Sequence, residues 1–248
     1  MQKESTVESE RIELLSNVAV LICTNRWDVA LQVMVGITQE RPDSGPAWEL
    51  RGLLESHLGF VSAAVSSLEQ ASLLVPLQPL ASRCLALDYI SQDRHRLGVE
   101  LLVSLARAQQ DPYFVRRINY DLLKLSEYQA SHQMLTESLA CVDSALLWHE
   151  LSATLSKLNR PAEESLSAAM RAISLSPDFA SYRVTAASLL VTMNEADDAF
   201  YLVRDLSAKQ IQELDCSCCL WRLIHIYNCF DSDERVRLCY SRLHELSL

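Results

Sequence analysis

Glycine and proline are scarce in this sequence of 248 residues, which contains only five glycines and seven prolines. Sandwiches, barrels and phosphate-binding loops depend on the tight turns that these residues make, so their scarcity favours helices. The isolated glycines never form the spacing of a nucleotide-binding loop. Neither G-x-S-x-G nor H-E-x-x-H occurs, which excludes two hydrolase classes. The sequence therefore predicts an all-α protein that is not an enzyme and needs no cofactor.

Long apolar runs are also lacking. The most apolar stretch, Val18 to Cys23, is much shorter than the roughly 20 residues that cross a bilayer, and the first five residues are largely polar. The eight cysteines are scattered along a chain large enough to fold without disulfides. We therefore expect no membrane span, no export by a signal peptide, reduced thiols and a cytoplasmic location.

Basic side chains are outnumbered, with 22 Lys and Arg against 32 Asp and Glu and a formal net charge of -10. The electrostatic field of a protein with this negative charge repels nucleic acid and anionic membrane surfaces, so neither is an expected partner. An apolar content of 49% supplies ample material for a packed core. The composition favours a folded protein whose partner is another protein or a peptide.

The sequence also contains an internal repeat. Pro42 and Pro76 are 34 residues apart, and the same step connects Ala30, Ala64 and Gly98, which are all small. Such self-similarity is typical of a helical array, in which each hairpin buries its apolar face against its neighbours.

The clearest unit resembles the tetratricopeptide repeat. Its matching residues are Trp48, Gly52, Ala64, Leu68, Ala71 and Pro76. It departs from the family pattern at Arg51, where leucine is usual, and at Glu55, where tyrosine is usual. The resemblance covers nearly the whole chain and implies an α-α superhelix of about seven helical hairpins, with the first helix of each pair lining a concave groove.

The resemblance implies one solenoid domain over residues 1–248. The repeat register slips between residues 107 and 128, where Asp111-Pro112 predicts a soft boundary between two sub-arrays. Residues 216–248 are expected to form a capping helix pair. Helix starts are expected at Asp43 or Ser44 and at Asp178. The acidic pairs are expected in the first turns of second helices, at Glu163-Glu164, Asp197-Asp198 and Asp233-Glu234.

The family geometry also implies which side chains face the groove. The candidate partner-binding residues are Glu49, Arg83, Arg116, Arg117, Asp121, Lys124, Ser181, Ser188 and Trp221. The four cations among them are suited to carboxylates or an acidic peptide, and the alternative is that they are ordinary solvated charges that pair with neighbours. The serines favour an apolar or extended peptide. Trp221 either anchors a peptide or packs within the array, whereas Trp48 and Trp148 are expected in the core.

Cys216-Ser217-Cys218-Cys219 is the sharpest local chemical feature, with His225 and Cys229 farther along the same predicted helix. Thiolates and imidazole are ligands for zinc or copper. The spacing matches no established pair of ligand knuckles, however, and cysteine also packs well between helices. Both interpretations stay open, and no metal is predicted.

The leading hypothesis is a non-enzymatic scaffold or adaptor that binds a protein segment in the concave groove. One alternative is a chaperone for secreted proteins. Another is a metal-dependent or thiol-redox regulator that uses the Cys216–Cys219 cluster. The sequence does not identify the partner.

Overall fold

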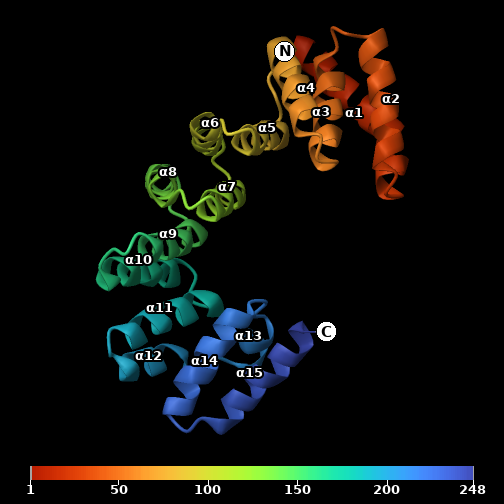
Figure 1. Ribbon diagram of the computed structural model, residues 1–248. Helices are drawn as coiled ribbons and strands as arrows, with labels where there is room; N and C mark the ends of the chain where they lie inside the picture. The colour runs from red at the N-terminus through yellow and green to blue at the C-terminus, as the bar shows by residue number, and fades with distance from the viewer. Residues whose placement is uncertain (1, 248) are drawn as a thin grey trace. The chain divides into compact units, whose positions relative to one another are not determined.

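The computed structural model describes residues 2–247, which form fifteen α-helices and no strand. The helices are α1 (Gln2–Cys23), α2 (Trp27–Glu40), α3 (Gly45–His57), α4 (Val61–Leu74), α5 (Pro79–Ser91), α6 (His95–Ala108), α7 (Pro112–Lys124), α8 (Tyr128–Cys141), α9 (Ala145–Lys157), α10 (Ala162–Leu175), α11 (Ala180–Thr192), α12 (Ala196–Val203), α13 (Ala208–Gln212), α14 (Ser217–Cys229) and α15 (Asp233–Leu246). The all-α prediction is confirmed (Figure 1).

Consecutive helices pack against each other as hairpins. The pairs are α1 with α2, α3 with α4, α5 with α6, α7 with α8, α9 with α10, α11 with α12, and α14 with α15. The short helix α13 lies between the last two pairs in sequence and packs against α15. Over residues 2–247 the structure therefore contains the seven hairpins that the repeat predicted.

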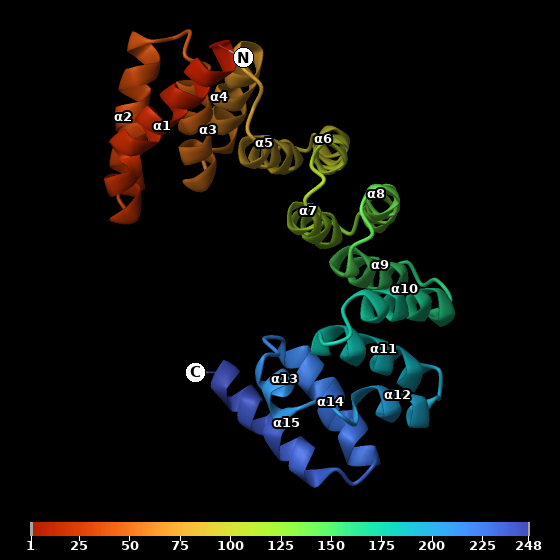
Figure 2. The same cartoon turned by 180° about the vertical axis from the view of Figure 1, so that it is seen from behind.

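The chain divides into two compact units, which we call unit 1, up to Ala108, and unit 2, from Gln109 onward. The division lies inside the stretch 107–128, where the sequence register slips. Unit 1 contains α1 to α6, and unit 2 contains α7 to α15. In unit 2, the first helices α7 and α9 lie on one side and their partners α8 and α10 on the other, as the views from front and back both show (Figures 1 and 2).

In three hairpins, small or short polar residues of the two helices approach each other closely. Gly98 lies against the carbonyl of Ala86, the Ser131 hydroxyl bonds to Asn119, and the Ser152 hydroxyl bonds to the carbonyl of Ser165. Small side chains at these contacts let the two helices approach closely. The small residues at these positions are therefore explained by the packing of the hairpins.

Each hairpin turn contains one residue with positive φ, which reverses the chain after the first helix. These residues are Asn25, Gly59, Asp93, Ser126, Asn159, Asn194 and Asp231, with φ between 49° and 81°. Glycine adopts this left-handed conformation without strain, and asparagine and aspartate tolerate it better than other residues. The scarcity of glycine is therefore compatible with a fold built from seven tight turns.

The predicted helix starts are mostly confirmed. The Ser44 hydroxyl caps α3 by accepting a hydrogen bond from the backbone N of Ala47 at 3.1 Å. All three acidic pairs lie in the first turns of second helices. The expected cap at Asp178 is wrong, because α11 begins one residue later and Phe179 occupies its N-cap position without a side-chain hydrogen bond.

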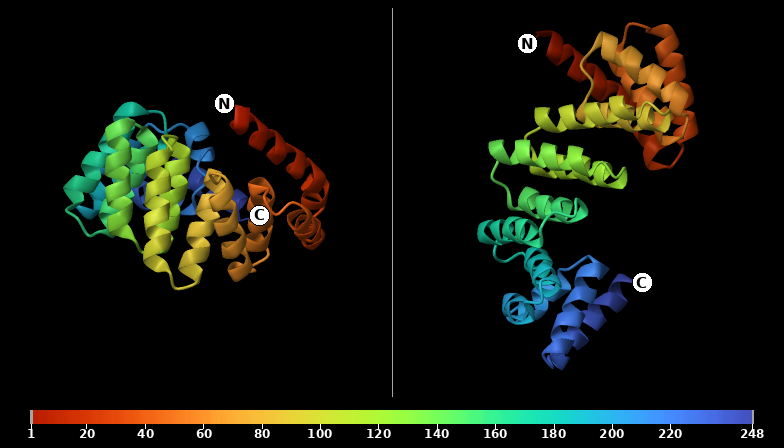
Figure 3. Two further views of the ribbon diagram at one scale, coloured as in Figure 1. Left: turned by 90° about the horizontal axis from the view of Figure 1, so that it is seen from above. Right: turned by 60° about the vertical axis from the view of Figure 1, so that its left-hand side comes forward.

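The N-terminal helix α1 has 22 residues, more than any other helix, and its first turns extend past α2 (Figure 3). Its apolar residues Leu14 and Val18 are buried in the core of unit 1 together with Ala30 and Met34. No helix within residues 2–247 combines the length and the apolar character needed to cross a membrane.

Candidate partner-binding face

The first helices of unit 2 are connected in series by side-chain contacts. Arg116 of α7 pairs with Glu150 of α9, with Nε 3.2 Å from Oε1. His149 of α9 contacts Thr185 of α11 through a 3.0 Å hydrogen bond between Nε2 and Oγ1. Helices α11 and α14 then pack together and line a common pocket. We call the surface of these four helices the first-helix face, and its residues are Arg116, Arg117, Lys124, His149, Glu150, Thr185, Ser188, Val191, Trp221, Arg222 and His225.

A pocket of about 260 Å³ lies between α11 and α14 on this face. Its lining is mainly apolar and comes from Ser188, Val191, Trp221, Arg222, His225 and Ile226. Trp221 is 55% exposed, and its ring meets that of Tyr240 edge-on, with 5.9 Å between the ring centroids. The structure thus brings together Ser188 and Trp221, which the sequence placed on two different hairpins.

Arg116 and Glu150 belong to a polar network that reaches into the hairpin core. The Asn119 side-chain amide donates to Glu150 Oε2 at 2.8 Å, and the Ser131 hydroxyl donates to Asn119 Oδ1. Burial raises the pKa of the Glu150 carboxyl, while the hydrogen bond from Asn119 and the charge of Arg116 act in the opposite direction. Arg116 therefore has a carboxylate partner within the chain, yet its side chain is 56% exposed.

His149 is a neutral polar group at the centre of the face. Burial, with the positive charges of Arg116 and Arg222, lowers its pKa from 6.5 to about 4. The Thr185 hydroxyl donates its single proton to the carbonyl of Ser181 at 3.0 Å. It must therefore accept the hydrogen bond from His149, which puts the imidazole proton on Nε2.

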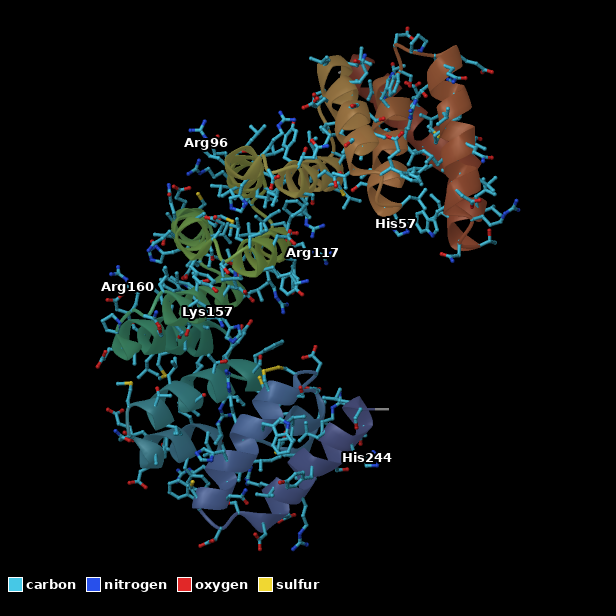
Figure 4. The ribbon with its side chains drawn as sticks, in the orientation of Figure 1. His57, Arg96, Arg117, Lys157, Arg160 and His244 are labelled. Atoms are coloured by element: carbon cyan, nitrogen blue, oxygen red, sulfur yellow. A yellow bond between two sulfur atoms is a disulfide. The ribbon has the colours of Figure 1, made fainter. Side chains whose placement is uncertain are left out.

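Arg117 and Lys124, both predicted to face the groove, are exposed on α7. Arg117 points away from α8, whereas Lys157 and Arg160 lie at the turn between α9 and α10 (Figure 4). The Lys124 ammonium lies 4.8 Å from the ring centroid of Tyr120, which is itself 53% exposed. Cationic and aromatic groups therefore lie side by side at the α7 end of the first-helix face.

Two predicted groove residues are buried. Glu49 accepts hydrogen bonds from Arg11 Nε and Nη2 at 3.0 and 2.8 Å and from the backbone N of Gln78 at 2.6 Å. Its carboxylate thus joins α3 to α1 and to the start of α5, so the expected partner-facing placement of Glu49 is wrong. Asp121 is also buried, at 5% exposure, so the same correction applies to it. Both side chains are covered by other parts of the chain.

The remaining predicted site residues occupy different positions. Arg83 is half-buried on α5 in unit 1, whereas the other three predicted cations belong to unit 2. Ser181 is half-buried in the first turn of α11. A binding role for these two residues stays a prediction.

The tryptophans expected in the core are half-buried and connect helix starts to the preceding loops. Trp48 Nε1 donates to the carbonyl of Pro42 at 2.9 Å. Trp148 Nε1 donates to Asp143 Oδ1 at 2.7 Å, and this bond is the main cause of the lowered pKa of the Asp143 carboxyl. The two rings therefore have equivalent roles in two hairpins.

The cysteine cluster contains a disulfide. Cys216 and Cys218 are bonded at the start of α14, with their Cα atoms 5.4 Å apart, and a sulfur-sulfur bond is visible there in Figure 4. The expectation of reduced thiols is thus wrong for these two residues, because the extended backbone at Cys216 precedes a helical turn that brings Cys218 back beside it. Cys219 completes a group of three sulfur atoms within 4.8 Å of one another, whereas His225 lines the pocket instead.

Sequence reasoning missed Arg222 as a residue of the face. Its position in α14 had no clear register, because the short helix α13 interrupts the 34-residue spacing just before α14. Tyr113 and Tyr120, 74% and 53% exposed on α7, were also missed. Their spacing of three to four residues from Arg116 and Arg117 was the available signal, since exposed aromatics beside cations are typical of binding surfaces.

Comparison with known proteins gives a match at the level of structure. No family model and no curated protein sequence matches this chain. The C-terminal part of a TPR repeat-containing protein from Cytophaga hutchinsonii superposes with a TM-score of 0.60 at 10% identity, covering 94% of this chain and 95% of that one. A tetratricopeptide repeat protein from Parabacteroides merdae gives 0.58 at 13% identity, covering 97% and 94%.

PilF of Pseudomonas aeruginosa is a third similar structure, with a TM-score of 0.54 at 16% identity, covering 84% of this chain and 93% of that one. Identities this low establish the fold alone. The chain therefore has the tetratricopeptide repeat fold, as its sequence predicted.

Proposed function

We propose that this chain is a non-enzymatic scaffold or adaptor that binds a segment of a partner protein on the first-helix face of unit 2. The observation that carries the proposal is the pocket between α11 and α14, where the half-exposed ring of Trp221 borders an apolar lining. Large exposed aromatics beside a pocket are the residues that most often supply binding energy at protein interfaces. An apolar side chain of the partner fits this pocket.

The cations of the first-helix face favour an acidic partner. Arg116, Arg117, Lys124 and Arg222 all belong to the first-helix face, although the whole chain has a net charge of -10. The charges of Arg116 and Arg222 both reach His149 strongly enough to lower its pKa. A local positive field in an acidic protein favours partners that carry carboxylates.

The proposed ligand is therefore an acidic segment with an apolar anchor. The anchor occupies the pocket at Trp221, and Asp or Glu side chains pair with cations toward α7. Helical repeat arrays bind extended segments or single helices in this way, by burial and a few charged contacts. Nucleic acid and membrane surfaces, which are themselves anionic, are disfavoured by the overall charge of the chain.

Selection from a random peptide library on the full chain tests this proposal. We expect the selected peptides to be enriched in Asp and Glu around one aromatic or large aliphatic residue. Their binding should weaken as salt concentration rises, because exposed charge pairs are screened. The double variant Arg117→Ser/Lys124→Ser should lose about tenfold in affinity, as expected for two charged contacts at the edge of an interface.

A matched double variant controls for the change in net charge. Lys157→Ser/Arg160→Ser removes the same two charges from exposed positions at the turn between α9 and α10. It should bind the selected peptides like the parent. Equal losses in both double variants, or selection of peptides without acidic residues, would contradict the proposed site.

The cytoplasm is the proposed location of this scaffold. Six cysteines are free, and three of them, Cys23, Cys141 and Cys229, are exposed. Exposed free thiols are typical of a reducing compartment. Alkylation of intact cells before lysis, followed by mass analysis, tests this: thiols at these three positions should be labelled, whereas their recovery as disulfides would indicate an oxidising compartment.

A further inference from the structure

Three of the eight cysteines are gathered in the first turn of α14. Cys216 is the N-cap residue, and Cys218 and Cys219 follow within the first turn. Their sulfur atoms lie within 4.8 Å of one another, and those of Cys216 and Cys218 are bonded. Cys218 is exposed to solvent, Cys216 is half-buried, and Cys219 is buried. The cluster is separate from the pocket at Trp221.

The disulfide between Cys216 and Cys218 is poorly suited to a structural role. A disulfide stabilises a fold mainly by restricting the unfolded chain, and the effect grows with the length of the loop that it closes. Here a single residue separates the two cysteines. Helix α14 is already fixed by the buried side chains of Leu220, Leu223 and Tyr227. The bond is therefore dispensable for the packing of this helix.

We propose that Cys216 and Cys218 form a reversible thiol–disulfide couple that exchanges with low-molecular-weight thiols and disulfides. Two features favour such exchange. Solvent exposure leaves the Cys218 sulfur accessible to a small thiolate. The N-terminus of α14 favours negative charge, so it stabilises the thiolates that form when the bond is reduced.

The exchange proceeds in two balanced steps. In oxidation, the Cys218 thiolate attacks one sulfur of a small disulfide, forms a mixed disulfide and releases one small thiolate. The Cys216 thiolate then attacks the Cys218 sulfur, forms the bond seen in the structure and releases the second small thiolate. The two cysteines lose two protons and two electrons, and the small disulfide gains them to become two thiols. Reduction by two small thiols reverses both steps.

Cys219 lies beside the couple but is chemically different. Burial raises the pKa of its thiol, the nearby carboxylate of Asp215 also raises it, and the charge of Arg222 partly offsets both. A thiol that stays protonated is a poor nucleophile. Cys219 is thus expected to stay reduced while its two neighbours exchange.

Equilibration of the full chain in glutathione buffers of graded ratio tests the proposal. Exchange is stopped with acid, and the free thiols are then alkylated. Mass spectrometry counts the labels on the tryptic fragment 210–222, which contains these three cysteines and no other. We expect the fragment to gain two labels together as the buffer becomes more reducing. Reoxidation should remove both labels by re-forming the disulfide, and the helical circular dichroism signal should stay unchanged throughout. Cys219→Ser should keep this transition, and Cys229→Ser, on the same helix, is a matched control that should also keep it.

Cys218→Ser should abolish the paired transition and leave a mixed disulfide with glutathione on Cys216. The proposal would be overturned if the pair stayed oxidised in strongly reducing buffer while the chain remained folded. It would also be overturned if the three thiols of the reduced chain resisted alkylation and one equivalent of zinc or copper was bound, because the cluster would then be a metal site.

Discussion

Arg51 and Glu55 form a partly buried ion pair at the two positions where the clearest repeat departs from the tetratricopeptide pattern. Arg51 Nε lies 2.8 Å from Glu55 Oε1, and the Glu55 side chain is only 4% exposed. Arg51 Nη1 also donates to the Thr38 hydroxyl at 3.1 Å, and the Ser67 hydroxyl donates to Glu55 Oε2 at 2.6 Å. One polar network therefore replaces two apolar side chains of the family pattern and connects three helices.

Breaking this pair should destabilise unit 1. We expect Arg51→Leu to lower the free energy of unfolding by about 3 kcal/mol, because it leaves the Glu55 carboxylate buried without a counter-charge. The double variant Arg51→Leu/Glu55→Tyr restores the residues usual in the family and should come within about 1 kcal/mol of the parent. Urea unfolding followed by circular dichroism measures both, and a double variant as unstable as the single one would contradict this interpretation.

The positive-φ turn residues predict a stabilising substitution. Ser126 has a φ of 61° in the turn between α7 and α8, where a side chain is strained and glycine is not. Ser126→Gly should therefore raise the free energy of unfolding by about 0.5 to 1 kcal/mol. At Gly59, with a φ of 81°, the reverse change Gly59→Ser should lower it by about 1 kcal/mol. Thermal or urea unfolding should show changes of opposite sign in the free energy of unfolding for Ser126→Gly and Gly59→Ser.

The close helix crossing at Gly98 predicts that a single methyl group is not tolerated there. A Cβ atom at this position would lie 2.4 Å from the carbonyl oxygen of Ala86, a backbone atom that cannot move aside. Gly98→Ala should lower the free energy of unfolding by about 2 kcal/mol. Gly36 in α2 is the matched control, since nothing lies within 4 Å of its Cβ position. Gly36→Ala should be stabilising by up to about 1 kcal/mol through helix propensity.

His149 should make stability dependent on pH. Its pKa is lowered from 6.5 to about 4 in the folded chain, so between these values the unfolded chain binds the proton and the folded chain does not. The stabilising contribution is therefore complete above about pH 6.5 and is lost as the pH falls. Between pH 7 and pH 5 the loss should be about 2 kcal/mol.

Comparison with His149→Gln isolates this contribution, because glutamine can donate to Thr185 but does not titrate. The neighbouring carboxyl of Glu150 has a raised pKa, which acts in the opposite direction, but it is present in both proteins. Urea midpoints at pH 7 and pH 5 should differ more for the parent than for His149→Gln. Equal differences would contradict the assignment to His149.

Much of the fold was predictable because small residues recur in the sequence at the spacing of the repeat. Ala30, Ala64 and Gly98 recur at 34-residue intervals and all three are buried, and this spacing predicted the number and order of the hairpins. The cap at Asp178 was mispredicted because a cap depends on where the helix begins, and the N-cap of α11 is one residue later. The sequence pattern thus predicted which helices form better than the residues at which they begin.

The candidate site was less predictable, because burial depends on which helix lies opposite. Glu49 occupies a first-helix position of the repeat, but Arg11 of α1 reaches across and covers it. Ser188 and Trp221 were placed on first helices by register alone, and the structure brings them to one pocket. Whether that pocket binds a partner stays a prediction.

The affinity of a selected acidic peptide for Trp221→Ala is the most direct test of the proposed binding face. Titration calorimetry should show a dissociation constant raised about 30-fold, which corresponds to roughly 2 kcal/mol at a central interface residue. Tyr201→Ala is the matched control, because Tyr201 is 63% exposed on the second helix α12. It should leave the affinity within about twofold of the parent. Unchanged affinity in Trp221→Ala, or an equal loss in Tyr201→Ala, would contradict binding on the first-helix face.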